Sequence, residues 1–254
     1  MRIHDIDRLV RALPGHIGVY ALDTATGETY EHNADDPIEA ASVIKLTVMA
    51  EAFRQFEAGL LDPASPVIIR REDKLPSCGA LTYLHDGLTV TALDLVTLMI
   101  ILSDNTATNL LIDRLGMERI NAMIEGLGLT GTRLNRKLFM PELAKKGIRN
   151  YVTARDMGRL LEGLLRGTVV SGGASEAMLG ILRDQRLNGK MPFFLHGRGV
   201  ACAHKTGEDD GITHDVGVIY AQRPVILCFL SEGTDVPMAE RALQDIAAIA
   251  ADPA

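Results

Sequence analysis

The sequence predicts an α+β fold, an α/β sandwich whose antiparallel sheet is built from both ends of the chain, with an inserted all-helical domain. Segments typical of strands lie near the two ends, at residues 16–33 and 200–231. Between them, apolar residues recur mostly at the spacing of helices. Strands from both ends most simply pair in one sheet. We therefore expect a mixed domain of residues 1–40 and 188–254 and a mainly helical domain of residues 41–187.

The elements expected in the N-terminal part follow from apolar periodicity and turn residues. Apolar residues at helical spacing precede Pro14, and a turn ending at Gly27 separates two strand-like segments. Ser42 then lies near the start of a largely apolar helical stretch. Three prolines interrupt residues 60–87, which predicts irregular surface loop. The expected elements are a helix at residues 5–13, strands at 16–22 and 28–33, and a helix from about 42 to 59.

Helices fill the middle of the chain, and strands return after residue 188. Thr91 is the predicted N-cap of an apolar helix, and polar residues 103–106 separate this helix from the next. Residues 129–151 show little periodicity and predict a long loop, which in a compact domain is usually functional or disordered. The expected elements are helices within 89–128 and at 153–165 and 173–186, strands at 200–204, 213–221 and 225–231, and a helix at 237–250.

The composition is ordinary for a globular enzyme. Hydrophobic residues make up 47% of the 254 residues, ample for a sizeable core. A formal net charge of −7 without basic clusters argues against nucleic acid as a partner. No run approaches the roughly 18 apolar residues of a membrane span, so we expect no membrane partner. Residues 1–7 contain no apolar signal core, which predicts a cytoplasmic location, or a periplasmic or secreted one if a leader was removed.

The cysteines give no sign of a disulfide framework or a metal site. Cys78, Cys202 and Cys228 are far apart and odd in number, and fit neither a disulfide scaffold nor the spacing of a metal site. We therefore expect no metal and no cofactor. A monomer that acts on a small molecule is the expected form of the protein.

Ser42 and Lys45 lie one helical turn apart in an apolar stretch. A buried lysine is costly unless it is paired or gives up its proton. A desolvated lysine beside a serine hydroxyl can activate that hydroxyl as a nucleophile. A capping serine followed by a lysine that extends to solvent explains the pair at least as well. The pair alone leaves both interpretations open.

Two further polar groups interrupt apolar surroundings. Ser103-Asp104-Asn105 lies at the junction of two predicted helices, and Lys205-Thr206-Gly207 follows His204 at the end of a predicted strand. Taken singly, helix capping explains the first group and a solvated strand end explains the second. The order Ser-x-x-Lys, Ser-Asp-Asn, Lys-Thr-Gly along one chain is far more specific than any of the three alone.

With these motifs the chain resembles a class A β-lactamase, and more broadly the superfamily of β-lactamases and penicillin-binding proteins. Residues 86–90 before the Ser-Asp-Asn helix also match, and residues 132–136 look like the entry to the family's omega loop. The resemblance covers most of the chain. It implies a β-lactamase/transpeptidase-like fold and a serine hydrolase that opens β-lactam rings through an acyl-enzyme.

The resemblance assigns roles to the motif residues. Ser42 would be the nucleophile and Lys45 its activating base, while Ser103 would pass a proton to the β-lactam nitrogen. Asn105 would bind the substrate's side-chain amide, and the Lys205-Thr206-Gly207 strand would bind the substrate carboxylate through Lys205 and Thr206. The backbone N–H groups of Ser42 and Glu208 would form the oxyanion hole.

Two departures from the family pattern concern later steps. The family releases the acyl group with an omega-loop glutamate, but the residues after Arg136 lack that glutamate in register. Glu142 is the one carboxylate of that segment, so we expect it to be the deacylation base, although a solvated loop position explains it equally well. Where many class A enzymes have an arginine after Gly211, this chain has His214, which we expect to bind the substrate carboxylate when protonated.

Three functions therefore remain open. The first is a β-lactamase-type hydrolase that acylates at Ser42 and releases product with water. The second is a serine peptidase, amidase or esterase of the same fold with poor β-lactam turnover. The third is a penicillin-binding, sensor-like module that is acylated and does not release the acyl group.

Overall fold

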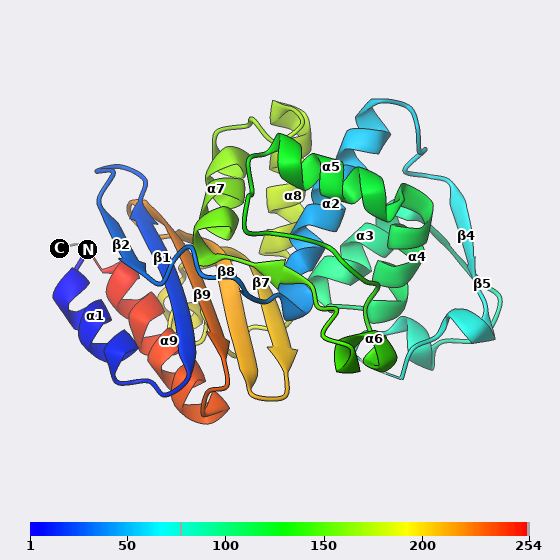
Figure 1. Ribbon diagram of the computed structural model, residues 1–254. Coiled ribbons are helices and arrows are strands. Elements are labelled where there is room, and N and C mark those ends of the chain that lie inside the picture. Colours follow the sequence, from blue (N-terminus) through cyan, green and yellow to red (C-terminus); the bar gives the residue numbers. More distant parts are fainter. Residues whose placement is uncertain (77, 253–254) are drawn as a thin grey trace.

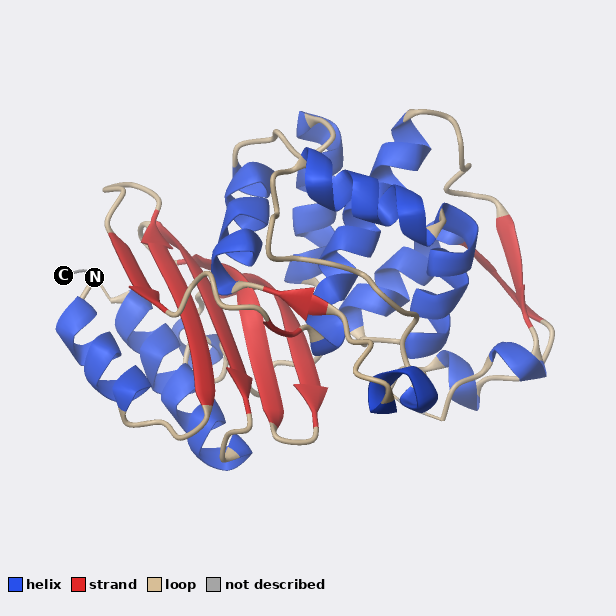
Figure 2. Ribbon diagram, viewed as in Figure 1, coloured by secondary structure: helices blue, strands red, loops and turns tan. Residues whose placement is uncertain are grey.

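A five-stranded antiparallel sheet separates two helices from a larger group of helices (Figures 1 and 2). The structure, a computed structural model, describes residues 1–76 and 78–252. The strand order is β2-β1-β9-β8-β7, so a strand from the start of the chain pairs with one from its end. The strands are β1 (His16–Asp23), β2 (Thr29–His32), β7 (Ala201–Asp209), β8 (Ile212–Tyr220) and β9 (Pro224–Glu232).

The two terminal helices, α1 (Ile3–Arg11) and α9 (Val236–Ala251), cover the outer face of the sheet (Figure 1). Side chains alternate between the faces of a strand. In β9, Leu227 and Phe229 accordingly join the cluster under α1 and α9, whereas Ile226 and Cys228 join the cluster on the inner face. The alternation explains why β9 is apolar at nearly every position, since both of its faces are covered.

The inner face of the sheet packs against the helical group, which surrounds α2 (Lys45–Glu57). Ten of the thirteen residues of α2 are buried, as expected for a helix enclosed on all sides. One hydrophobic cluster runs from the inner face of the sheet through this group, so the two predicted domains share a core. The other helices are α3 (Ala92–Ile101), α4 (Asn105–Leu115), α5 (Met117–Gly126), α6 (Pro141–Lys145), α7 (Ala154–Leu165) and α8 (Gly172–Arg183).

The α+β class, the antiparallel sheet and the helical region between its strands are confirmed. The exact domain boundaries stay a prediction. Within residues 1–76 and 78–252, no helix has the length and apolar character needed to cross a lipid bilayer.

Two short sheets were not predicted. β4 (Pro66–Ile69), inside residues 60–87 that were expected to be irregular, pairs with β5 (Leu88–Thr91), which occupies the start of the stretch that was expected to be helical. A proline is tolerated as the first residue of a strand, as Pro66 is here, so the prolines did not exclude a hairpin. β3 (Ile38–Glu39) pairs with β6 (Tyr151–Val152), which brings the chain before Ser42 beside the end of the long loop.

The strand β7 is longer than predicted. It continues to Asp209 instead of ending at His204. The reason is backbone pairing with β8, in which Lys205, Thr206 and Gly207 lie opposite Val216, Asp215 and His214. The Lys-Thr-Gly motif therefore lies inside the sheet edge and not in a solvated turn.

Candidate active site

Ser42 and Lys45 lie where the chain enters the central helix. Ser42 belongs to a 3₁₀ segment, Ala41–Ile44, and Lys45 is the first residue of α2. Lys45 is fully buried, and its Nζ lies 2.9 Å from Ser42 Oγ. Ala41 has a φ of +41°, a conformation that costs a non-glycine residue about 1–3 kcal/mol and clusters at functional sites. Lys45 therefore does not extend to solvent but donates toward the serine hydroxyl.

Ser103 joins this pair from the junction between α3 and α4. Its φ of +53° is also left-handed and turns the residue toward α2. Lys45 Nζ lies 3.0 Å from Ser103 Oγ and 2.7 Å from Ser103 O. The same ammonium nitrogen is 2.7 Å from Asn105 Oδ1. Lys45 thus connects the first motif to the second.

Lys205 completes the group from β7. Its side chain is fully buried, and its Nζ lies 3.0 Å from Ser103 Oγ and 2.7 Å from the carbonyl of Thr206. Ser42, Lys45, Ser103 and Lys205 therefore form one continuous chain of hydrogen bonds. A proton can move along such a chain without a rearrangement of the backbone.

The two lysines carry shifted pKa values. Burial lowers the pKa of Lys45 well below its ordinary value, and the charge of nearby Lys205 lowers it further. Burial lowers the pKa of Lys205 to about 7, against the opposing effect of the Asp215 carboxylate. Both lysines therefore give up a proton more readily than an exposed lysine does, and near neutral pH Lys205 keeps part of its positive charge.

Asp104 fixes the turn that carries Ser103 and Asn105. One carboxylate oxygen accepts hydrogen bonds from the N–H groups of Ala80 and Leu81, and the other caps α4 at Ala107. A Cβ on Gly79, whose φ is +120°, would lie 2.3 Å from the Asp104 carboxyl carbon. This close approach of residues 78–81 also places Cys78 Sγ 3.6 Å from Asn105 Nδ2.

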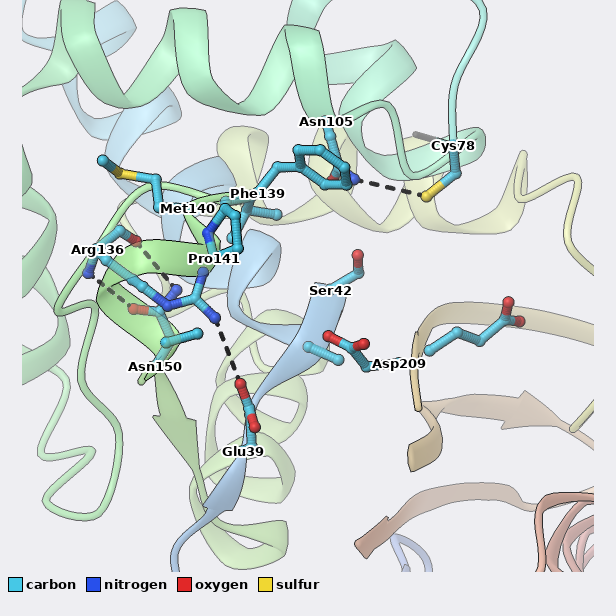
Figure 3. A pocket seen from close by; sticks show the side chains of 14 residues that line it. Glu39, Ser42, Cys78, Asn105, Arg136, Phe139, Met140, Pro141, Asn150 and Asp209 are labelled. Atoms are coloured by element: carbon cyan, nitrogen blue, oxygen red, sulfur yellow. Dashed lines mark hydrogen bonds and ion pairs between the residues drawn. The ribbon is translucent and has the colours of Figure 1, made fainter. Parts of the chain in front are cut away.

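A cavity of about 370 Å³ opens over Ser42 (Figure 3). Its floor is at Ser42 and Asn105, one wall is the end of β7, and the opposite wall is the long loop before β6. This volume lies in the range of small-molecule sites. The lining residues are Glu39, Ala41, Ser42, Cys78, Asn105, Arg136, Leu138, Phe139, Met140, Pro141, Ala144, Asn150, Glu208 and Asp209.

The β7 wall packs closely on the segment that carries Ser42. A Cβ on Gly207 would lie 3.2 Å from Val43 and 3.0 Å from His214, so a larger residue would push the strand away from Ser42. Thr206 is buried, and Glu208 lies at the cavity wall with its carboxylate 3.1 Å from Lys190. The structure thus brings all three motifs to one place.

Glu142 is not brought to Ser42. It lies in the short helix α6 with a side chain 79% exposed, and its carboxylate pairs with Lys145 at 3.3 Å. It is absent from the described residues that line the cavity, although its neighbours Met140, Pro141 and Ala144 are present. The loop faces Ser42 with apolar side chains where the sequence suggested a carboxylate.

His214 requires a correction. Its side chain is fully buried, and its Nε2 lies 2.8 Å from the carbonyl of Glu39 while its Nδ1 lies 3.1 Å from the N–H of Ser231. These partners define a neutral ring that donates through Nε2 and accepts through Nδ1. Burial lowers its pKa to about 4. No ring nitrogen remains for a substrate carboxylate, so the expected role is wrong in this arrangement.

The sequence did not predict the ion pairs and hydrogen bonds that hold the loop wall. Arg136 reaches Glu39 at 3.4 Å, and Arg149 reaches the other oxygen of Glu39 at 2.7 Å. Asn150 accepts from the N–H groups of Asn135 and Arg136 and donates to the carbonyl of Arg136. A long, aperiodic segment with several Arg and Asn residues was the only signal in the sequence.

The described residues contain no group of three or more His, Cys, Asp or Glu side chains placed to hold a metal ion. The site is instead rich in hydroxyl and ammonium groups. Such a set suits acyl transfer to a serine, with an amine as base and a second cation for an anionic substrate.

Comparisons with known proteins agree with this geometry. The family model described as the beta-lactamase enzyme family matches residues 2–253. Beta-lactamase 3 of Bacillus cereus is 27% identical over 237 residues, which cover 91% of this chain and 73% of the relative. The crystal structure of a beta-lactamase from Sphaerobacter thermophilus has a TM-score of 0.91 at 32% identity and covers 98% of this chain and 97% of that one. A variant of PBP-A in an acyl-enzyme complex with penicillin G has a TM-score of 0.87 at 26% identity and covers 98% and 94%.

Proposed function

The chain belongs to the β-lactamase enzyme family and is an enzyme that hydrolyses β-lactams, and we propose that it does so through an acyl-enzyme on Ser42, in the manner of class A. The observation that carries this proposal is the buried Lys45, whose Nζ lies within 3.0 Å of both Ser42 Oγ and Ser103 Oγ. A lysine in this position serves as a base toward one hydroxyl and as a proton source toward the other.

Acylation begins with attack of Ser42 Oγ on the carbonyl carbon of the lactam. The hydroxyl proton moves to neutral Lys45, and the new C–O bond makes a tetrahedral oxyanion. The backbone N–H groups of Ser42 and Glu208 are the donors proposed for this oxyanion. When the C–N bond breaks, Ser103 protonates the leaving nitrogen and recovers a proton from Lys45. The ring is then open, and the acyl group stays on Ser42 as an ester.

Substrate binding is proposed to use the charge of Lys205. Lys205 lies directly behind Ser103, and Thr206 lies beside it in β7. Together they present a cation and a hydroxyl to the carboxylate that β-lactams carry. Asn105, which forms part of the cavity floor, is the proposed donor to the side-chain amide.

Release of the acyl group is proposed to be the slow step. Hydrolysis of the ester needs a base that activates water on the free side of Ser42. The loop offers Phe139, Met140 and Pro141 to the cavity, while Glu142 is turned to solvent. Glu39 lines the cavity but is held between two arginines. Glu142 can act as the base only after α6 reorients. The same apolar wall favours the third function left open by the sequence, a penicillin-binding, sensor-like module that is acylated and does not release the acyl group.

A chromogenic cephalosporin tests both candidates. We expect a fast burst of one absorbance equivalent per protein, followed by a slow steady rate. The groups proposed for acylation lie in hydrogen-bonding contact, whereas Glu142, the carboxylate expected to activate water for release, faces solvent. Many fast turnovers without a burst would contradict slow release, and a burst with no later rate would select the penicillin-binding module. No burst and no turnover would reject acylation at Ser42.

Two variants test the proposed roles of Ser42 and Glu142. Ser42→Ala removes the nucleophile and is expected to abolish both the burst and covalent labelling by a fluorescent penicillin. Glu142→Gln is expected to change the lifetime of the acyl-enzyme less than twofold, because the side chain faces solvent. A lifetime extended by orders of magnitude would show that α6 turns Glu142 toward the ester.

A further inference from the structure

Lys190 is a buried cation that the proposed acylation steps do not use. It lies in the segment between α8 and β7, and its side chain is only 5% exposed. Its Nζ lies 3.1 Å from the carbonyl oxygen of Gly207 and 3.5 Å from that of His214. Two carboxylates complete its surroundings, Glu208 at 3.1 Å and Glu240 of α9 at 3.6 Å. These oxygen partners offset the loss of hydration and hold the ammonium group against the end of β7.

The carbonyl that Lys190 binds belongs to the peptide group between Gly207 and Glu208. The N–H of this same peptide group is a proposed donor, together with the N–H of Ser42, to the oxyanion of the lactam. Peptide groups are planar, and no cis peptide bond occurs among the described residues, so this C=O and N–H point in opposite directions. β7 is an edge strand of the sheet (Figure 1), and Glu208 lies in the cavity wall. A cation that fixes the carbonyl therefore also fixes the direction of the Glu208 N–H.

A charged donor on the carbonyl also strengthens the N–H at the other end of the peptide group. Hydrogen bonds that involve an ionised group are roughly twice as strong as neutral ones. Hydrogen bonds in series polarise one another and strengthen by about 10–30% per bond. With its oxygen bound to the ammonium group of Lys190, the peptide group carries more positive charge on the N–H of Glu208. This N–H is then a better donor to a negative oxygen, which is the task of an oxyanion hole.

We propose that Lys190 is a positioning residue for the oxyanion hole, which orients and polarises the peptide group between Gly207 and Glu208. This inference rests on the proposed acylation at Ser42. Lys190 is not among the described residues that line the cavity, so it acts on the reaction through the backbone of β7. Its contribution should appear when the tetrahedral oxyanion forms and much less when the substrate first binds.

The charge of Lys190 also acts on Lys205, and this second effect has the opposite sign. Burial lowers the pKa of Lys205 to about 7, and the charge of Lys190 adds to this lowering. Removing the charge of Lys190 therefore raises the pKa of Lys205, which then keeps more of its positive charge for an anionic substrate. Slower acylation in a variant without this charge consequently points to the oxyanion hole and not to Lys205.

Penicillin G provides a kinetic test. Stopped-flow measurements over a range of concentrations at pH 6.5 separate the dissociation constant of the first complex from the rate constant of acylation. Lys190→Met leaves the Glu208 N–H in place but removes the cation behind it. Because loss of a whole oxyanion donor lowers the rate by about 10²–10³-fold, we expect the acylation rate constant of Lys190→Met to fall by about tenfold. The dissociation constant should change less than about twofold.

The infrared spectrum of the acyl-enzyme gives a direct readout of the oxyanion hole. Penicillin G labelled with ¹³C at the lactam carbonyl places the label in the ester on Ser42, and a difference spectrum against unlabelled penicillin isolates its stretching band. Hydrogen bonds to a carbonyl oxygen lower this frequency, so Lys190→Met should move the band to higher wavenumber. Lys190→Arg keeps a cation that can donate to Gly207 and should return the band toward its wild-type position.

Two further variants address a purely structural explanation. Lys190→Gln removes the charge but keeps a polar group, so it carries the test if Lys190→Met does not fold, with a smaller shift in the same direction. Glu240→Gln is the matched control, because it removes a neighbouring charge of Lys190 while its amide oxygen can still accept from Thr213. This control should leave both the acylation rate constant and the band unchanged.

The outcomes separate the role of Lys190 from the proposed function. A lower acylation rate constant together with a shifted band, confined to Lys190→Met and Lys190→Gln, supports the inference. An unchanged band in these variants, whether or not the rate falls, would overturn the role of Lys190 while acylation at Ser42 stands, and so would an equal shift in Glu240→Gln. Failure of penicillin G to acylate the wild type would overturn the proposed function and the inference with it.

Discussion

Lys45 Nζ and Lys205 Nζ each lie 3.0 Å from the same atom, Ser103 Oγ. Two ammonium groups that share one hydroxyl in a buried site repel each other, so one of them is held neutral at little further cost. The pKa of Lys45 is lowered well below its ordinary value, first by burial and then by the charge of Lys205, which favours the neutral form of Lys45. The hydroxyl of Ser103 therefore sits between a base and a cation.

The role of Lys45 can be tested by Lys45→Met, which keeps the length of the side chain but removes the base. General-base catalysis contributes about 10²–10⁴-fold, so we expect the rate of labelling by a fluorescent penicillin to fall by about a thousandfold. The thermal unfolding midpoint should not fall, because a buried amine is replaced by an apolar group. Lys146→Met, at an exposed loop position, is the matched control.

An unchanged labelling rate in Lys45→Met would reject Lys45 as the base. A large fall in the unfolding midpoint would instead mean that the lysine is chiefly structural. Stopped-flow labelling and a thermal scan on the same sample distinguish the two.

The pH dependence of kcat/KM should report Lys205. Its pKa of about 7 means that it is positive below pH 7 and loses its charge as the pH rises through that value. Because an anionic substrate needs that charge, kcat/KM for penicillin G should fall above about pH 7. The profile of kcat/KM reports the free enzyme, in which this pKa applies.

Lys205→Arg provides the control for this profile, since guanidinium stays charged throughout the accessible range. The fall above pH 7 should disappear in this variant, even if its absolute rate is lower. A fall that persists at the same pH would assign the titration to a different group.

His214 should make the fold sensitive to acid. Burial lowers its folded-state pKa to about 4, below the ordinary 6.5, so the folded protein binds the proton less well than the unfolded chain. This part of the stability is fully present above about pH 6.5 and is lost as the pH falls toward 4. At pH 5 the loss amounts to about 2 kcal/mol. Urea unfolding at pH 7.5 and 5.0 measures it.

His214→Gln retains an amide donor for the Glu39 carbonyl but does not titrate. We expect its free energy of unfolding to change less between pH 7.5 and 5.0 than that of the wild type, by about the same 2 kcal/mol. Equal changes in both proteins would show that the acid sensitivity comes from other groups.

Much of the fold was predictable because it depends on local patterns. The helix expected at residues 5–13 forms at Ile3–Arg11, and the apolar runs of β8 and β9 and the Thr91 cap appear where the sequence indicates. The β4–β5 hairpin was missed because Pro66 was read as a breaker, although it occupies a strand end. The end of β7 was misplaced because backbone pairing with β8, and not side-chain polarity, sets its length.

The sequence by itself determined which residues could perform acyl transfer. The spacing of Ser42 and Lys45 nearly dictates their contact, because residues three apart meet on one turn. The motif set then identified Ser103 and Lys205 as their partners, and the structure places them in hydrogen-bonding contact across 58 and 102 residues of sequence separation.

Only the tertiary structure decided where the remaining charged groups point. His214 is buried and fully bonded because β8 is covered on both faces, and Glu142 faces solvent because α6 presents Pro141 and Ala144 to the cavity instead. Asp209 faces the cavity because β7 extends to that residue. The direction of a side chain in a loop or at a strand end depends on long-range packing, and no local periodicity encodes it.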